Sequence, residues 1–305
     1  MSILKYIHML PLKKIYIDSR DRTVDSKSAS NFKIELPNTV QMPENTVFFV
    51  TDVCIPHVWK TIEGGFNDKL YLFTHTPSGP LPAQQAIAND QFTVITIPEG
   101  NYTLIELATR LSQILIAALT STARQFTTFV VSPDANNFSI TISMTGSSSS
   151  VWFKFFTDRE VASEIYRNVD WKNSLGNSVS VNRGNLESAN DIFKFTSPMD
   201  IDATLHTGFV NLNHINNVYI TSPHLGSFDT LATFSNNVIK KVPVNASYGF
   251  MVVDQVMSTN DFLNCSRQTL RTLEFHLRDG RGREIDLKGM YITFSIVFNK
   301  YNLDM

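Results

Sequence analysis

The chain has few cysteines and few charged residues for its length. Only two of its 305 residues are cysteine, Cys54 and Cys265. Two distant thiols exclude a disulfide framework, and they form no C-x-x-C motif, so we expect both to be buried and reduced. Charged residues make up 18% of the chain, against roughly 25% in an average globular protein. Together with 22 Phe and 9 Tyr, this shortage favours a surface partly covered by partner proteins.

Long apolar runs and a strong net charge are also missing. No run approaches the ~18 apolar residues of a membrane-spanning helix. The N-terminal stretch MSILKYIHMLPLKKIYI is interrupted by Lys5, His8, Lys13 and Lys14, so it lacks the apolar core of a signal peptide. The net charge of −2 argues against a chain that binds nucleic acid over its whole surface. The sequence therefore predicts a soluble protein made in a reducing compartment, without a membrane span.

Motifs of catalytic and metal sites are absent from the sequence. The seven histidines form no H-x-H, H-x-x-x-H or H-E-x-x-H pattern, so zinc or a cupin-type metal site has no scaffold. His276 with Glu284 is a poor remnant of the cupin pattern, and strand alternation places His276 on an outer face as an ordinary surface histidine. No G-x-S-x-G, P-loop or G-x-G-x-x-G is present. We therefore expect no catalytic residue, no cofactor, no metal and no enzyme activity.

What the sequence does contain is alternation with a period of two residues. In NFKIEL, Phe32, Ile34 and Leu36 fall on one face and Lys33 and Glu35 on the other, as in a strand with one buried face. The same signal occurs in TVFFVTDVCIPHVW, KLYLFTHT, QFTVITI, NVYITS, YGFMVVDQV, TLEFHL and MYITFSIVF. Short strands separated by Gly, Pro, Asn and Asp are typical of a mainly β protein: a sandwich, barrel or jelly roll.

The middle of the chain breaks this pattern. In YTLIELATRLSQILIAALTS, apolar residues recur every three or four positions, which predicts an amphipathic helix. Thr103 and Glu106 have capping-box spacing at its start, and Thr157 and Glu160 have it at the start of a second, shorter helix. Between the helices, FTTFVVSPDANNFSITIS predicts a hairpin around Asp134–Asn137. This mixture of helices and strands predicts an α+β domain.

We interpret this α+β domain as an insertion. It covers residues 89–199 and separates residues 1–88 from residues 200–305, which are both almost purely β. Neither flank alone has enough strands to close a sandwich, so insertion into a loop of one β domain explains the order better than two domains in tandem.

Basic residues gather in two places. The first 22 residues carry five Lys and Arg against two Asp, and residues 1–14 have the character of an N-terminal arm. Contact of this arm with nucleic acid is an alternative, but a solvated arm is favoured. The second place is RDGRGR, residues 278–283. Because LEFHL before it and EIDL after it both alternate, we expect a hairpin of two half-buried strands with the arginines at its tip.

Three segments resemble one protein family: IYIDSRDRTVDSKSASNFKIELP at 15–37, IPEGNYTLIELATRL at 97–111 and CSRQTLRTLEFHLRDGRGREIDLKGMYITFSIVF at 265–298. Together they resemble the penton (minor capsid) proteins of virophages and polinton-like viruses. The resemblance covers most of the chain and is strongest at its ends. It implies a single jelly-roll β-sandwich of eight strands with an inserted α+β domain. It also implies a homopentamer at each fivefold vertex of an icosahedral dsDNA virus, surrounded by double-jelly-roll capsomers of the major capsid protein.

The resemblance thus implies a structural capsid protein of the virion, synthesised in the host cytoplasm. A head-to-tail contact that closes after five copies would cover the surplus of aromatic residues. Arginines are expected at the subunit interface, although those near residue 20 have a self-contained turn with Asp18 and Asp21 as their alternative. The interface candidates are Arg20, Arg22, Arg278, Arg281 and Arg283.

Two other functions compete with a capsid vertex. One is a receptor- or carbohydrate-binding jelly-roll module displayed on a particle surface, with a host receptor or glycan bound by the inserted domain. The other is a jelly-roll enzyme, which would need the clustered His or acidic ligands that the sequence lacks.

Overall fold

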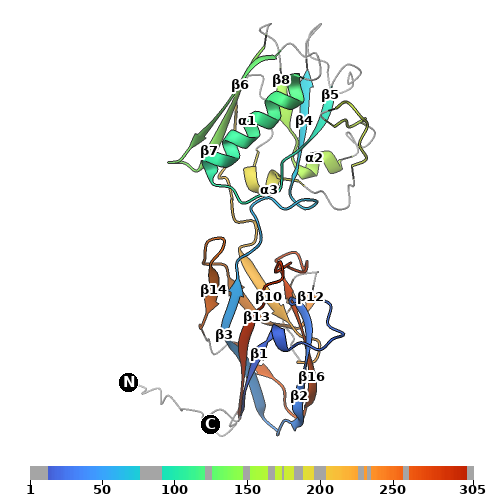
Figure 1. Ribbon diagram of the computed structural model, residues 1–305, viewed down its shortest axis with the longest axis vertical. Helices are drawn as coiled ribbons and strands as arrows, with labels where there is room; N and C mark the ends of the chain where they lie inside the picture. Colours follow the sequence, from blue (N-terminus) through green and yellow to red (C-terminus); the bar gives the residue numbers. More distant parts are fainter. Residues whose placement is uncertain are drawn as a thin grey trace. The chain divides into compact units, whose positions relative to one another are not determined.

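The chain folds into two units, one inserted into the other. The computed structural model describes residues 13–75, 91–120, 126–146, 152–163, 169–173, 175–181, 188–195, 204–225, 230–231, 235–256 and 261–300. One unit contains Met1–Trp59 and Ile215–Met305, and the other contains Lys60–His214 (Figure 1). Each unit has buried hydrophobic clusters of its own.

The first unit is a jelly roll of two antiparallel sheets. In one sheet the order is β1 (Lys13–Asp18), β17 (Thr293–Lys300), β3 (Thr46–Pro56) and β14 (Met251–Asp254), with the short β15 (Leu263–Asn264) also paired to β3. In the other the order is β13 (Val238–Pro243), β10 (Asn217–Thr221), β16 (Thr269–Arg278) and β2 (Asn31–Gln41). A short ribbon of β11 (Thr230–Leu231) and β12 (Ser235–Asn236) follows β10. Among the eight main strands, the chain changes sheet at every step except from β10 to β13, which is the order of a jelly roll.

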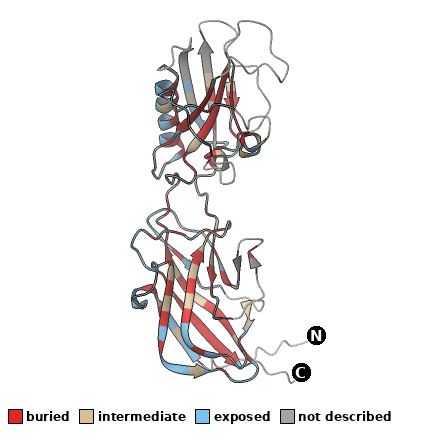
Figure 2. Ribbon diagram, turned by 90° about the vertical axis from the view of Figure 1, so that its right-hand side faces the viewer, coloured by how far each residue is buried: buried red, intermediate tan, exposed pale blue. Residues whose placement is uncertain are grey.

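The core of the jelly roll lies between its two sheets. Alternate residues of β2 and β16 are buried, as the period-two pattern predicts, and Figure 2 shows this burial along the strands. Phe275 of β16 contacts Phe32 of β2, with ring centroids 5.5 Å apart, and Phe294 of β17 at 5.0 Å. Since β17 belongs to the opposite sheet, Phe275 joins the two sheets at the core.

The inserted unit combines two three-stranded sheets with helices. In one sheet β4 (Lys69–His75) lies between β5 (Gln91–Thr96) and β8 (Trp152–Phe155), and in the other β7 (Ser139–Gly146) lies between β6 (Phe126–Asp134) and β9 (Thr204–His206). The long helix α1 (Leu104–Thr120) buries its apolar face in a core that includes residues of both sheets. Two short helices are α2 (Asp158–Ala162) and α3 (Asn190–Phe193). No helix in the described part of the chain is long and apolar enough to cross a membrane.

Both predicted capping boxes are present. The Thr103 N–H donates to Glu106 Oε2 at 2.9 Å, and the Glu106 N–H donates to Thr103 Oγ1 at 3.3 Å. Thr157 and Glu160 form the same reciprocal pair at the start of α2. Two backbone donors at each helix start are therefore satisfied locally. The expected continuation of α2 through residues 164–168 lies outside the described residues.

The predicted hairpin between β6 and β7 is confirmed. Asp134 pairs with Ser139 across its end. The Asp134 carboxylate accepts the backbone N–H groups of Asn136 and Asn137 at 2.9 and 3.2 Å. This local capping explains why the turn was visible in the sequence.

The inserted unit in the structure is longer than the sequence analysis placed it. The predicted insertion was 89–199, between 1–88 and 200–305, whereas the structure divides the chain after residues 59 and 214. The N-terminal boundary differs because β4 pairs with β5 and β8 of the inserted unit. The C-terminal boundary differs because β9 pairs with β7, and Val210 is buried in the same core. Alternation identifies a strand but not the sheet that it joins.

Removing the Phe275 ring should destabilise the jelly roll by about 3–5 kcal/mol. The reason is that Phe275→Ala leaves a cavity between the two sheets. Chemical denaturation measures the resulting loss in the free energy of unfolding. The control Val24→Ala, at a fully exposed position, should change the free energy of unfolding by less than about 0.5 kcal/mol. A Phe275→Ala protein as stable as the wild type would contradict this position for Phe275.

Candidate functional site

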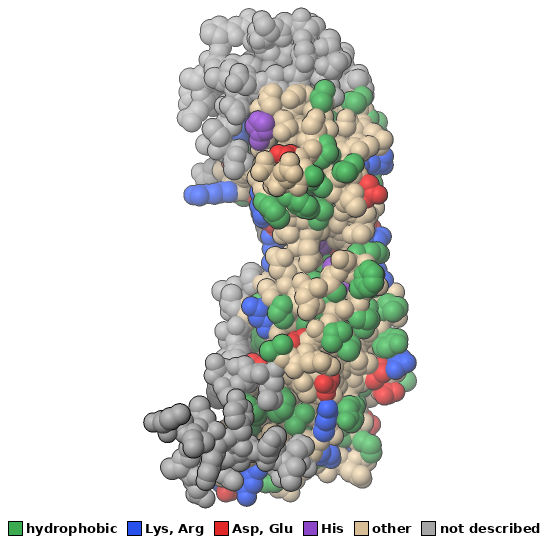
Figure 3. Space-filling model, turned by 90° about the vertical axis from the view of Figure 1, so that its left-hand side faces the viewer, with side chains coloured by type: hydrophobic (Ala, Val, Ile, Leu, Met, Phe, Trp, Pro, Cys, Tyr) green, Lys and Arg blue, Asp and Glu red, His purple; other side chains and the backbone are tan. Residues whose placement is uncertain are grey.

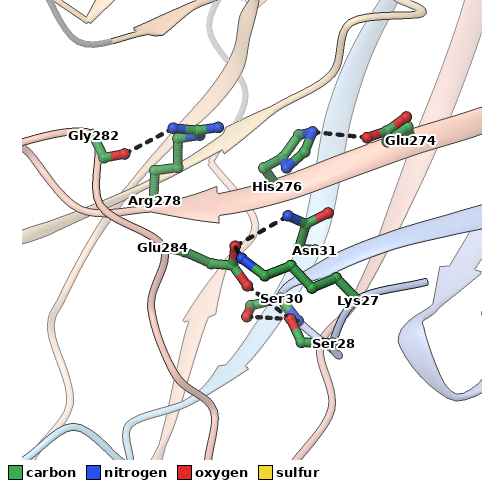
Figure 4. Close-up of polar contacts among 9 residues, drawn as sticks. All are labelled: Lys27, Ser28, Ser30, Asn31, Glu274, His276, Arg278, Gly282 and Glu284. Atoms are coloured by element: carbon green, nitrogen blue, oxygen red, sulfur yellow. Dashed lines mark hydrogen bonds and ion pairs between the residues drawn. The ribbon is translucent and has the colours of Figure 1, made fainter.

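The RDGRGR segment forms a tight turn at the end of β16. Asp279 is buried, and its Oδ1 accepts the backbone N–H groups of Arg281 and Arg283, both at 2.9 Å. Its Oδ2 pairs with the Arg283 guanidinium. Arg278 Nη1 donates to the Gly282 carbonyl oxygen at 2.8 Å (Figure 4). Asp279 therefore organises the turn, and both Arg278 and Arg283 make contacts within it.

The second strand predicted for this hairpin is not formed. After the turn the chain makes one bridge, from Arg278 to Glu284, and one backbone hydrogen bond from the Ile285 N–H back to β16. The chain then leaves β16, and the next strand, β17, begins only at Thr293 in the opposite sheet. Ile285 and Leu287 are buried nevertheless. The alternation after the turn thus comes from burial without strand pairing.

Glu284 connects the arginine turn to the loop before β2 (Figure 4). Its carboxylate accepts hydrogen bonds from Lys27 Nζ at 3.1 Å, Asn31 Nδ2 at 3.0 Å and Ser28 Oγ at 2.9 Å. Burial disfavours the ionised form, but the hydrogen bonds from Asn31, Lys27 and Ser28 outweigh it and hold the pKa of Glu284 below its ordinary value. These hydrogen bonds hold the loop between Arg22 and β2 against the arginine turn.

His276 lies beside this network on β16. Its Nε2 is 3.2 Å from Glu274 Oε1, and its side chain is only 17% exposed. This histidine is more buried than the surface residue that alternation predicted, because it lies between β10 and β2, opposite Thr221 and Asn31. Burial, and then the charge of Arg278, lower its pKa. Within the described ranges, no group of three His, Cys, Asp or Glu side chains could hold a metal ion.

Arg20 and Arg22 lie in and just after a short turn that follows β1. Arg20 Nε donates to the Asp18 carboxylate at 3.0 Å, and its guanidinium lies 4.2 Å from the centroid of the Tyr291 ring. Hydrogen bonding by Arg20 lowers the pKa of Asp18. Arg22 Nη1 donates to the Ser19 carbonyl oxygen at 2.9 Å. Both arginines thus have local contacts, and their role at a subunit interface stays a prediction.

A buried charged cluster was missed by the sequence analysis. Lys240 on β13 has a side chain only 5% exposed. Its Nζ donates to the Val256 carbonyl oxygen at 2.7 Å and lies 3.4 and 3.5 Å from carboxylate oxygens of Asp254 and Asp261. These contacts join β13 of one sheet to β14 of the other. The signal was present, since alternation places Lys240 on the same face as the buried Val238 and Val242.

The inserted unit has a pocket of about 400 Å³ beside α1. Its lining includes Thr96 of β5, Arg110, Gln113 and Ile114 of α1, and the exposed Leu175. Arg110 Nη1 donates to Gln113 Oε1 at 3.0 Å. One cation, an amide and apolar side chains around a concave surface could hold a small ligand that carries hydroxyl or acidic groups.

The two cysteines are free thiols. Cys265 is buried as predicted, and burial raises its pKa to about 12, so it stays protonated and unreactive. Cys54 on β3 is only half-buried, because its side chain does not share the inward face of Val53 and Ile55.

These features define a class of fold: a single jelly roll that carries an α+β unit between its third and fourth main strands. No protein-family model and no curated protein sequence matches the chain. Among solved structures, the chain is similar to the selenomethionine-labelled mavirus penton protein, with 12% sequence identity and a TM-score of 0.49. The match covers 95% of this chain and 100% of that one. A similarity this distant gives no evidence of function, so a function has to be inferred from the residues of the chain itself.

Replacing Lys240 by Met should lower the free energy of unfolding by about 3–5 kcal/mol, because it leaves buried carboxylate charge without its partner. Chemical denaturation measures this loss. Lys241→Met is the matched control, since Lys241 is the next residue and is exposed, and it should change stability by less than about 0.5 kcal/mol. Equal effects of the two substitutions would contradict the buried cluster.

Replacing Glu284 by Gln should destabilise the protein at about pH 7 by about 1–2 kcal/mol, because three charge-assisted hydrogen bonds are weakened. The folded-state pKa of Glu284 lies below its ordinary value of 4.5. Its contribution is therefore present above that value and is lost as the pH falls through the folded pKa. The stability difference between wild type and variant should shrink on acidification, as followed by denaturation at several pH values.

The control for this pH series is Glu35→Gln, whose side chain is 54% exposed and pairs with Arg271. Such a surface pair contributes less than about 1 kcal/mol. A wild-type advantage over Glu284→Gln that stays constant from neutral to acidic pH would argue against the proposed network.

Proposed function

We propose that this chain is a structural capsid protein, the penton at the fivefold vertices of an icosahedral dsDNA virus. By its sequence motifs it would be a penton of the virophage and polinton-like type, similar to the mavirus form. The proposal assigns it no catalytic role. In this function the protein is synthesised in the host cytoplasm and resides in the virion.

The observation that carries the proposal is the architecture of the jelly roll. The resembling segments 15–37 and 265–298 lie at opposite ends of the sequence, yet they contain most of β1, β2, β16 and β17, which are paired in the two sheets. The third segment, 97–111, leads into α1 of the inserted unit. A single jelly roll with an α+β insertion is the fold that the family resemblance implies. Sequence motif and topology therefore support the same class of protein.

The proposed partners are four further copies of the chain and the surrounding capsomers of a double-jelly-roll major capsid protein. A head-to-tail contact that closes after five copies forms a ring. Of the arginine candidates, Arg20 with its 60% exposed side chain and the exposed Arg281 are best placed to contact a neighbour. The less exposed Arg22, Arg278 and Arg283 make contacts within their own turns, and Arg20 also pairs with Asp18. Residues 1–12 of the N-terminal arm lie outside the described residues, so a DNA contact there is only an alternative.

A second candidate function is favoured by the pocket beside α1. Arg110, Gln113 and Thr96 around a volume of about 400 Å³ would suit a receptor- or carbohydrate-binding module displayed on a particle. A binding module of this kind is compatible with a capsid vertex. Unlike the vertex function, ligand binding requires no ring of five copies.

The purified protein should form a ring of five 34.4 kDa chains, about 172 kDa, because the proposed contact is head-to-tail and closed. Light scattering gives the mass and negative-stain microscopy gives the symmetry. If the protein is monomeric in isolation, the ring should form on mixing with purified capsomers, as followed by co-sedimentation. A strict monomer that ignores capsomers but binds a glycan array would favour the carbohydrate-binding module instead.

A further inference from the structure

We propose that the two outer edges of the sheet β1–β17–β3–β14, which pair with no further strand among the described residues, bind each other between copies. The β14 edge of one copy packs against the β1 edge of the next copy. This inference rests on the proposed function, since it names the surfaces through which the ring closes.

Exposed apolar side chains of the jelly roll gather at these two edges. In the described part of this unit, nine large hydrophobic residues are exposed, and five of them lie in residues 248–256, around β14. Of three others, Tyr16 lies on β1, Tyr291 lies against Arg20 just after β1, and Met290 is the residue before Tyr291; the ninth is Val24. Figure 3 faces the side on which β14 lies and shows hydrophobic side chains at the surface of the jelly roll. The β14 group is Tyr248, Phe250, Met251, Val253 and Val256, and the β1 group is Tyr16, Met290 and Tyr291.

The β14 edge lacks the usual protection of an open sheet edge. Natural edge strands carry outward lysines, prolines or other charges that prevent pairing with another chain. On β14 the outward residues are Met251 and Val253, 45% and 43% exposed, whereas Val252 and Asp254 are buried. Asp254 is the only charged residue of segment 248–256, and it faces Lys240 inside the sandwich. The outer surface of this edge is therefore apolar and uncharged, as expected of a surface that a protein covers.

The β1 edge is aromatic and basic, with Lys13, Lys14 and Tyr16 exposed on the strand. Tyr16 is 76% exposed, and Tyr291 lies under the Arg20 guanidinium. The outward Lys14 is paired with Asp52 on β3. Aromatic rings with an arginine stacked on them are enriched in protein interfaces. This edge would offer rings and a cation to the aliphatic and Phe side chains of the β14 edge.

The positions of the two edges select a second copy as the partner. They lie at opposite ends of the same sheet, and their surfaces are unlike. A contact between unlike surfaces on opposite sides of a subunit is heterologous, so each copy contacts two neighbours and a ring can close. A β14–β14 contact would be isologous, would stop at a dimer and would leave the β1 edge uncovered.

A cross-linking experiment tests the pairing directly. Met251→Cys and Tyr16→Cys are introduced separately and together in a Cys54→Ser background. That background is required because Cys54 lies opposite Val253, the outward neighbour of Met251 on β14, and is only half-buried. Mild oxidation should link a mixture of the two single variants into a dimer, with neither variant linking to itself. The double variant should give a ladder that ends at five copies.

Charge on the β14 edge provides an independent readout. Met251→Asp with Val253→Asp should raise the concentration at which the oligomer dissociates by at least about tenfold, as measured by light scattering. The matched control is Val130→Asp in the inserted unit, where the side chain is 55% exposed, and it should leave assembly unchanged. Circular dichroism and thermal unfolding check that both variants are folded.

Each other result overturns the inference. Self-linking of Met251→Cys alone would show a β14–β14 contact. A wild-type ring that persists in the Met251→Asp, Val253→Asp variant would show that the ring uses other surfaces, and the penton function would stand. A Met251→Cys, Tyr16→Cys double variant that gives no cross-links, even among capsomers, would overturn the edge contact, while co-sedimentation would judge the penton function separately.

Discussion

The jelly roll depends on β17, which lies between β1 and β3. It pairs with both strands, and its Phe298 packs against Phe48 of β3, with ring centroids 6.0 Å apart. Its Phe294 contacts Phe275 of the opposite sheet. One strand near the C-terminus thus closes the sheet formed by the N-terminal strands and also fills the core. Because the two ends of the chain are tied together in this way, the chain can leave after residue 59 and return at residue 215 without opening the sandwich.

Lys240 both stabilises the sandwich and affects the charge on its surface. By binding the Val256 carbonyl and facing Asp254, it holds β14 against β13 on the other sheet. The same contact turns the only charge of the β14 segment inward. Burial of an ion pair contributes little net stability compared with an apolar replacement. For assembly, the position of β14 and the missing charge on its outer surface therefore matter more than the stability that the Lys240 ion pair contributes.

The arginine-rich turn is held together by its own side chains. Three arginines in six residues could form an anion site, but the structure uses Asp279 to accept two backbone N–H groups and the Arg283 guanidinium. Arg278 donates to a backbone carbonyl of the same turn. Glu284 adds a carboxylate that collects donors from the loop before β2. Donors engaged in this way stabilise a loop junction, and so the turn fits a structural role better than phosphate binding.

Features that depend on neighbouring residues could be predicted from the amino-acid sequence: the buried alternation of β2 and β16, helix α1, the capping box at Thr103 and the position of the arginine turn. Features that depend on residues across the sandwich required the three-dimensional structure. Period two marks β4 as a strand but not its partners in the inserted unit. It predicts that Ile285 is buried, but not that the segment around Ile285 forms no strand. It also cannot show that Lys240 pairs with a carboxylate on the other sheet. Local patterns record which side of a segment is buried, whereas the partner that buries it is chosen by contacts between segments far apart in the chain.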